Sequence, residues 1–214
     1  MELYDFWRSS AAYRVRIVLN LKGLEAERTF INISPARLEH NEPAYREINP
    51  QGFVPLLVLD DGTKITQSMA ICEYLDEMHP NPRLIPEVPL ARADIRALAQ
   101  MVACDIHPLN NARVLRFLKE TLNHDQETIA KTWYAHWIRE GFDAMEQVID
   151  DGGYCRGETP SLADAFLIPQ IYNAHRFEVD LAPYPRIRRV EKTCNGMEAF
   201  AAAAPEKQPD AVTT

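Results

Sequence analysis

Two adjacent serines, Ser9 and Ser10, lie near the N-terminus in the stretch FWRSSAAYRVRIVLN, between an apolar segment typical of a strand and a segment patterned as a helix. A helix N-terminus carries a partial positive charge and unpaired N–H groups, so a hydroxyl there helps to stabilise an anion. One serine could equally be an ordinary helix cap, and serine statistics alone favour that interpretation. A ligand role gains weight because the strand-to-helix junction of a βαβ unit is a common binding site.

Two further stretches of the first 81 residues suggest the same kind of site. In NPQGFVP, Pro55 opens a strand and cannot donate to its ladder, which predicts a turn or a cis bond and leaves the backbone of Val54 free for an external partner. An ordinary proline at a strand start is the alternative. In TQSMAICEYL, Gln67 and Ser68 precede an apolar helix, whose N-terminus could bind a carboxylate. Each stretch is weak evidence alone, but the three together favour a ligand site.

The second half of the chain offers polar groups around a helix break. Pro108 interrupts a helical pattern in CDIHPLNN, so the helix must kink or end there and expose backbone groups. A ligand wall and a solvated helix face are equally consistent with the polar residues that surround this break: His107, Asn110, Asn111 and Arg113.

Two other polar positions lie at the ends of one predicted helix. Arg176 ends an apolar helix, where a cation stabilises the helix dipole, so a stability role competes with a ligand role. Ser161 and Asp164 have the spacing of a capping box at the start of that helix, and we interpret them as structural.

The elements that must position these residues change character near residue 80. The first part predicts a βαβ unit with parallel strands, an antiparallel hairpin turning at Asp61-Gly62, and a further helix. The expected strands are Glu2–Phe6, Ala26–Ile33, Val54–Leu59 and Thr63–Thr66, and the expected helices are Ala11–Lys22, closed by Gly23, and Ser68–Met78.

A proline-rich stretch, HPNPRLIPEVP, separates this part from a helical one. We expect a first domain at residues 1–81, a linker at 82–90 and an all-helical domain at 91–214, with a polar, frayed tail after Pro205. The helical periods cover Ala91–Leu122, Gln126–Ile149, Ser161–Arg176, Pro185–Cys194 and Met197–Ala203.

Composition excludes several classes of function. The formal net charge of −8 argues against general affinity for nucleic acid, so an anionic ligand must meet a local positive site. We find no spacing typical of a metal site or a disulfide framework, and we expect buried thiols in a reducing compartment at all four cysteines, Cys72, Cys104, Cys155 and Cys194. No leader peptide and no membrane-spanning run is evident, which predicts a cytoplasmic protein without a membrane partner.

The motifs, taken in order, resemble the zeta class of glutathione transferases, which includes maleylacetoacetate and maleylpyruvate isomerases. The segments that carry the resemblance are FWRSSAAYRVRIVLNLKG, INPQGFVPLL, QSMAICEYL, CDIHPLNN, SLADAFLIPQ and RFEVDLAPYPRI, and they span nearly the whole chain. The resemblance implies a thioredoxin-like N-terminal domain with a mixed four-stranded sheet that binds glutathione, an all-helical C-terminal domain, and a homodimer.

The resemblance also implies roles for individual residues. Ser9 and Ser10 would face the glutathione sulfur, with Ala11 beside them; Val54 next to cis-Pro55 would pair with the cysteinyl backbone. Gln67 and Ser68 would hold the γ-glutamyl carboxylate. The resemblance also implies glutathione contacts by four further residues, although it supports them less strongly than the contacts above: His40, Asp105, His107 and Asn111. The carboxylates of a dianionic substrate would be bound by Arg8, Arg113 and Arg176.

One departure from the family pattern narrows the expected chemistry. Many zeta members have Ser-Ser-Cys where this chain has Ser9, Ser10 and Ala11, which argues against reactions in which a protein thiol resolves a mixed disulfide. The expected activity is glutathione-dependent cis–trans isomerisation of maleylpyruvate or maleylacetoacetate, in aromatic or tyrosine catabolism. The alternatives are a transferase that conjugates small α-halo acids and, from another class, a non-catalytic glutathione-binding protein; thioredoxin-type redox catalysis lacks its cysteine.

Overall fold

The computed structural model describes residues 1–212, which divide into two compact units. Unit 1 comprises Met1–Arg83 and the chain from Met197 onward, and unit 2 comprises Leu84–Gly196. The predicted division had placed everything after residue 90 in one helical domain. The last segment instead packs with unit 1, because Arg16 and Asn20 of its first helix donate hydrogen bonds to the carbonyls of Ala203 and Ala199.

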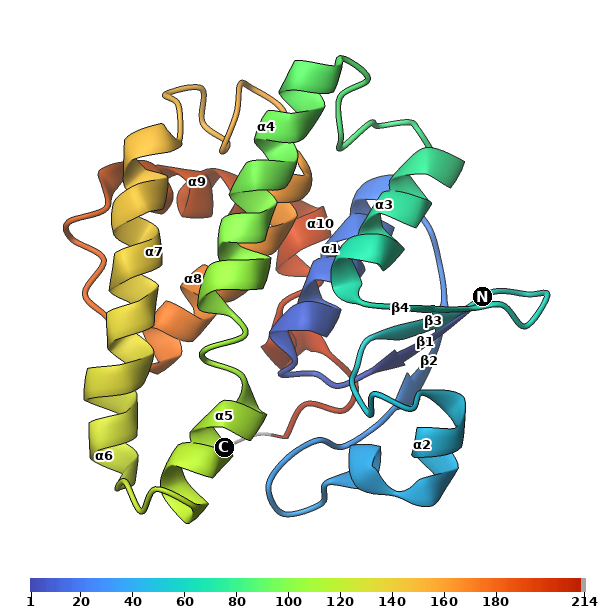
Figure 1. Ribbon diagram of the computed structural model, residues 1–214. Helices are drawn as coiled ribbons and strands as arrows, with labels where there is room; N and C mark the ends of the chain where they lie inside the picture. The colour runs from blue at the N-terminus through green and yellow to red at the C-terminus, as the bar shows by residue number, and fades with distance from the viewer. Residues whose placement is uncertain (213–214) are drawn as a thin grey trace. The chain divides into compact units, whose positions relative to one another are not determined.

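A four-stranded mixed sheet, in the strand order β2-β1-β3-β4, forms the centre of unit 1. β1 is parallel to β2 and antiparallel to β3, and β3 and β4 form the expected hairpin. Figure 1 shows α1 and α3 on one face of this sheet and α2 on the other. The elements of unit 1 are β1 (Glu2–Asp5), α1 (Ser10–Lys22), β2 (Glu27–Phe30), η1 (Glu39–Asn41), α2 (Pro43–Ile48), β3 (Leu56–Val58), β4 (Lys64–Thr66), α3 (Ser68–Met78), α10 (Glu198–Ala201) and η4 (Pro205–Lys207).

Local sequence signals account for much of unit 1. Gly23 ends α1 in the left-handed conformation, with φ of 63°, and Gly62 turns the hairpin with φ of 85°, as glycine does without steric cost. Helix α3 has the predicted bounds. The strands are shorter than predicted, and α2 and η1 were missed because their polar sequence has no apolar period.

Unit 2 is entirely helical among the residues that the structure describes. Its elements are α4 (Pro89–Gln100), η2 (Met101–Ile106), α5 (Ala112–Glu120), α6 (Gln126–Thr128), η3 (Ile129–Tyr134), α7 (Ala135–Val148), α8 (Leu162–Arg176) and α9 (Pro185–Asn195). The predicted break at Pro108 is confirmed: α4 continues into η2, a π-helical stretch, and the chain is irregular before α5. Helix α8 is the core of this unit, and Ser161 and Asp164 form its capping box.

Three expectations about the chain are wrong in detail. The segment after Pro205 is not frayed, since Pro205 and Gln208 are buried and the Gln208 amide donates to the carbonyls of Ala202 and Ala204. Cys104 is exposed, unlike the other three cysteines. Helix α4 begins at Pro89, inside the expected linker, because proline suits the first helical position. Within residues 1–212, no helix combines the length and apolar character needed to cross a bilayer.

Candidate active site

The three predicted ligand-binding segments of unit 1 meet at one end of its sheet. Tyr4 of β1 pairs with Leu56 of β3, which in turn pairs with Thr66 of β4. Because β3 is antiparallel to both neighbours, the residues that follow β1 and β4 are level with the residues that precede β3. The N-terminus of α1, the Val54-Pro55 bond and the N-terminus of α3 are therefore neighbours.

Ser9 is the N-cap of α1, and only 8% of its surface is exposed. Its Oγ accepts a hydrogen bond from the N–H of Ala12 at 3.2 Å, so the capping role is present. A hydroxyl that accepts one bond keeps its own proton, which remains able to donate to a ligand. Ser10 is the first residue of α1 and is half-buried, with Ala11 after it. No acidic residue lies in this first turn to offset the positive end of the helix dipole.

The backbone N–H and C=O of Val54 are available to a ligand. The Val54-Pro55 bond is cis, and among residues 1–212 neither the N–H nor the C=O of Val54 has a hydrogen-bond partner. The loop before it is fixed, because the carbonyl of Phe53 accepts bonds from the Tyr45 hydroxyl at 2.7 Å and the Asn49 amide at 2.8 Å. A rigid loop thus presents the unpaired backbone N–H and C=O of Val54, which suits recognition of another backbone.

Gln67 and Ser68 form the second helix N-terminus at this end of the sheet. Gln67 has φ of 71°, a conformation that is unfavourable for a side-chain-bearing residue and is concentrated at ligand sites. Its amide donates to the Gln51 side chain at 2.7 Å, while the buried Ser68 hydroxyl accepts from Arg14 at 3.2 Å. The first turn of α3 again lacks an acidic residue, and the buried Arg14 guanidinium adds positive charge.

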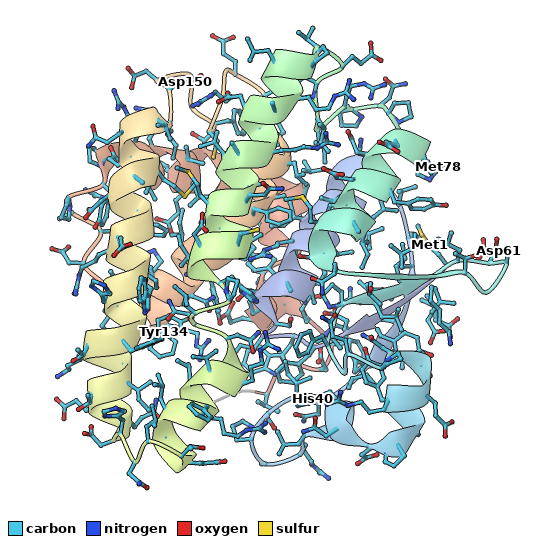
Figure 2. The ribbon with its side chains drawn as sticks, viewed as in Figure 1. Met1, His40, Asp61, Met78, Tyr134 and Asp150 are labelled. Carbon is cyan, nitrogen blue, oxygen red and sulfur yellow. The ribbon has the colours of Figure 1, made fainter. Side chains whose placement is uncertain are left out.

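His40 and Arg8 are the remaining predicted residues of unit 1. His40 lies in η1 beside α2, as Figure 2 shows. A Cβ on Gly52 would come within 2.8 Å of the His40 carbonyl, so η1 approaches the loop that leads to Val54. Arg8 is half-buried, and its guanidinium lies 5.1 Å from the centre of the Trp7 ring.

In unit 2, Tyr134 connects the helix break with the end of α8; it is labelled in Figure 2 on the chain that leads into α7. Its carbonyl accepts from the Asn110 amide at 3.1 Å, and the neighbouring Trp133 indole donates to the Leu109 carbonyl at 2.9 Å. The Tyr134 ring stacks on Phe177 with centroids 3.6 Å apart. Tyr134 therefore contacts both the loop that precedes Arg113 and Phe177, the residue after Arg176.

The predicted cations and polar groups of unit 2 are mostly accessible. Arg113 and Arg176 are exposed; the Arg176 guanidinium donates to the Asn173 side chain at 3.3 Å and lies 5.1 Å from the Phe177 ring centre. Asn111 caps α5 by accepting from the N–H of Arg113. His107 is half-buried just after η2, whereas Asp105 is exposed on η2, and no ion pair of Asp105 occurs in the described chain.

Unit 1 has no cysteine that is placed to act as a nucleophile. Cys72 is the single cysteine of unit 1, it is fully buried in α3, and burial raises its thiol pKa. Burial likewise raises the thiol pKa values of Cys155 and Cys194 in unit 2. Unit 1 therefore has helix N-termini suited to an anion but no accessible thiolate of its own. Between residues 1 and 212, no group of three or more His, Cys, Asp or Glu side chains could hold a metal ion.

Sequence reasoning missed the residues that hold these segments in place. Gln51 and Arg14 each bond one member of the Gln67-Ser68 pair, and Tyr45 fixes the loop before Val54. One signal was available: Arg14 lies in a run of apolar residues, and a buried guanidinium needs acceptors. The spacing of Val15, Val18 and Leu19 indicates one apolar face for α1, but every residue from Ala12 to Leu19 is buried.

Comparison with known proteins gives matches to both halves of the chain. The family model "Glutathione S-transferase, N-terminal domain" matches residues 8–78, and "Glutathione S-transferase, C-terminal domain" matches residues 131–191. The maleylacetoacetate isomerase of Pseudomonas aeruginosa is 48% identical over 210 residues, which cover 98% of each chain.

Solved structures are similar over the whole length. One is the holo structure of a maleylpyruvate isomerase, described as a bacterial glutathione S-transferase of the zeta class, with 44% identity, a TM-score of 0.95 and coverage of 99% of this chain and 100% of that one. Another is a maleylacetoacetate isomerase from Methylobacterium extorquens with bound malonate and glutathione, with 38% identity, a TM-score of 0.92 and full coverage of both chains.

Proposed function

The chain belongs to the zeta class of the glutathione S-transferase family, and we propose that it is a glutathione-dependent cis–trans isomerase of a cis-enedioic keto acid, maleylacetoacetate or maleylpyruvate. The observation that carries the proposal is the unpaired backbone N–H and C=O of Val54 at the same sheet end as Ser9, in a unit without an accessible thiolate. A site that binds a backbone and stabilises an anion, yet has no sulfur of its own, suits a thiol peptide.

The residues of unit 1 fit the chemistry of glutathione. The Val54 peptide would pair with its cysteinyl backbone, and Gln67 and Ser68 at the α3 N-terminus would hold its γ-glutamyl carboxylate. Ser9 would face the sulfur, with Ser10 and Ala11 beside it. His40 borders the same loop, and Asp105, His107 and Asn111 would contribute from the helical part. In this proposal residues 1–81 bind glutathione, and the helices after the 82–90 linker bind the second substrate.

When bound, glutathione would supply a thiolate for addition to the conjugated double bond; the resulting enolate would have a single bond there that can rotate, and elimination would return the same thiolate. The role of the chain would be to stabilise the negative charges and to orient the two reactants. The Ser9 hydroxyl donates to the sulfur without competing as a nucleophile, and the α1 dipole stabilises the negative charge. Substrate carboxylates, and the charge that develops on the keto oxygen, are stabilised by guanidinium groups.

Three arginines are the proposed partners of the two substrate carboxylates: Arg8, Arg113 and Arg176. Guanidinium groups bind carboxylates through two parallel hydrogen bonds, and here they would supply local positive charge to a chain whose net charge is −8. The Methylobacterium relative, which holds the dicarboxylate malonate together with glutathione, supports a dianionic substrate.

The test is to follow the ultraviolet absorbance of maleylacetoacetate and of maleylpyruvate with substoichiometric glutathione. We expect many turnovers per glutathione, with free thiol unchanged in a parallel titration. Loss of one thiol per turnover would favour the conjugating transferase instead. No turnover of either acid and no retention on glutathione resin would overturn the proposal. The same proposal includes a homodimer, which size-exclusion chromatography with light scattering tests. It also includes a cytoplasmic location, which cell fractionation tests.

A further inference from the structure

The C-terminal segment of unit 1, residues 199–211, is bound closely to the rest of that unit; we call it the C-terminal strap. Phe200 and Pro205 are buried, and Gln208 is 8% exposed. The strap is held by polar bonds from its start to its end: Asn20 donates to the Ala199 carbonyl at 2.9 Å, and Arg28 donates to the Gln208 side chain at 3.2 Å. A segment so attached is able to support what it contacts.

The strap binds the backbone N–H of Trp7 directly and the Trp7 carbonyl through Arg16. The N–H of Trp7 donates to Oδ2 of Asp210 at 2.9 Å. The carbonyl of Trp7 accepts from Nη2 of Arg16 at 2.9 Å, and Nε of the same guanidinium donates to the Ala203 carbonyl at 3.0 Å. The bonds of Arg16 are shielded from water, because its side chain is 1% exposed and paired with Asp5, whereas Asp210 is half-buried.

Two of the three ligand-facing segments of unit 1, those of Ser9 and Val54, adjoin this contact. Trp7 lies two residues before Ser9, whose N–H donates to the Phe6 carbonyl at 2.9 Å, so a shift of this turn moves the Ser9 hydroxyl. Ala211 packs against the cluster formed by Phe6, Trp7, Tyr45 and Val54. The end of the strap therefore contacts the turn that carries Ser9 and the core beneath Val54.

We propose that Asp210 is a positioning residue, which holds the Trp7 peptide so that the Ser9 hydroxyl is aimed at the sulfur of bound glutathione. The inference rests on the proposed function. Its physical basis is that the bond from the Trp7 N–H to a carboxylate is charge-assisted, and that without it this N–H loses its acceptor. A misplacement of about 1 Å at a catalytic group is enough to cost about a hundredfold in rate.

The experiment compares the full chain with Asp210→Ala, the conservative Asp210→Asn, and Lys207→Ala as an exposed control on the strap. Hydrogen–deuterium exchange of residues 6–10, measured without glutathione, reports on the turn alone. The pH dependence of kcat and an ultraviolet titration of bound glutathione report on the thiolate. Asp210→Ala should speed exchange about tenfold, raise the thiol pKa, and lower kcat at neutral pH about tenfold, with activity recovering at higher pH.

Asp210→Asn keeps an oxygen acceptor and should stay within about threefold of wild type, as should Lys207→Ala. Asp210→Leu, a side chain of similar size without an acceptor, should behave like Asp210→Ala and keeps the test decisive if the alanine variant folds poorly. Unchanged exchange at residues 6–10, or an unchanged thiol pKa in an active Asp210→Ala enzyme, would overturn the inference. Absence of glutathione binding or turnover in the wild type would instead count against the proposed function, while the exchange result would still be interpretable.

Discussion

Replacement of Ser9 separates the two roles that one oxygen atom has at the N-terminus of α1. The Oγ caps the helix by accepting from Ala12 at 3.2 Å, and in the proposed mechanism its proton is donated to the sulfur of glutathione. Ser9→Ala removes both functions. Ser9→Gly removes the hydroxyl but caps a helix nearly as well as serine, and Ser9→Thr keeps both functions. The set of three substitutions therefore distinguishes folding from catalysis.

The magnitudes follow from these two bonds. Loss of the cap in Ser9→Ala should lower the free energy of unfolding by about 1 kcal/mol, whereas Ser9→Gly should lower it by only a few tenths of a kcal/mol. A hydrogen bond to a charged group in a buried position is worth about 1.5–3 kcal/mol, which corresponds to a rise of about 1–2 units in the pKa of the bound thiol. Ala and Gly should raise this pKa equally, although they differ in stability.

Urea unfolding measures the cap, and ultraviolet titration of the thiolate together with the pH profile of kcat measures the donor. The hydroxyl stabilises the anion, so it lowers the thiol pKa in the wild type. Without it, activity at neutral pH should fall by up to about ten- to hundredfold and recover as the pH rises above the new pKa. Ser10→Ala is the matched control. If Ser10→Ala raises the pKa and Ser9→Ala does not, the roles are reversed; if neither does, the helix dipole alone stabilises the anion.

Three further predictions test other parts of the chain. Arg176→Met should lower kcat/KM for the keto acid about tenfold, whereas Arg188→Met, which removes another exposed arginine, should change it less than about twofold; equal effects would leave Arg176 only its helix-dipole role. Burial raises the pKa of Tyr45 to about 12 from 10.0, so the stability that its neutral form provides should be complete below pH 10 and lost as the pH rises toward 12. Burial also raises the pKa of Tyr184 to about 12, so Tyr45→Phe should lower the amplitude of this late step in an ultraviolet difference titration by one tyrosine, and an unchanged amplitude would contradict the assignment. Ala11→Cys, made with Cys104→Ser to remove the exposed thiol, should add disulfide exchange with glutathione and alter isomerase turnover only modestly; efficient reductive dehalogenation of a chlorinated hydroquinone by the unmodified chain would show that position 11 does not limit this chemistry.

Features set by a few adjacent residues could be predicted from the sequence. The bounds of α3, the left-handed Gly23 and the hairpin turn at Gly62 follow from caps, apolar period and glycine conformation. The break at Pro108 was equally local. The short helix α2 could not be found in this way, because its single buried residue, Tyr45, gives no period; what holds it is the bond from the Tyr45 hydroxyl to the next loop.

In the candidate site, the ligand-facing groups could be predicted from local sequence signals. The residues that hold these groups in place could not, because they are far away in the sequence. Arg16 reaches Ala203, 187 positions away, and Trp7 reaches Asp210, 203 positions away. One clue was present: a guanidinium in the apolar run of α1 has to find acceptors if it is buried. The polar tail after Pro205 was expected to be frayed because it has few apolar residues, yet its Gln208 and Asp210 accept hydrogen bonds from Arg28 and from the Trp7 N–H. Arg16 finds a charged partner nearby in Asp5, but its bond to Ala203 and the bond from Trp7 to Asp210 both end in the C-terminal segment, so neither could be predicted from residues close in the sequence.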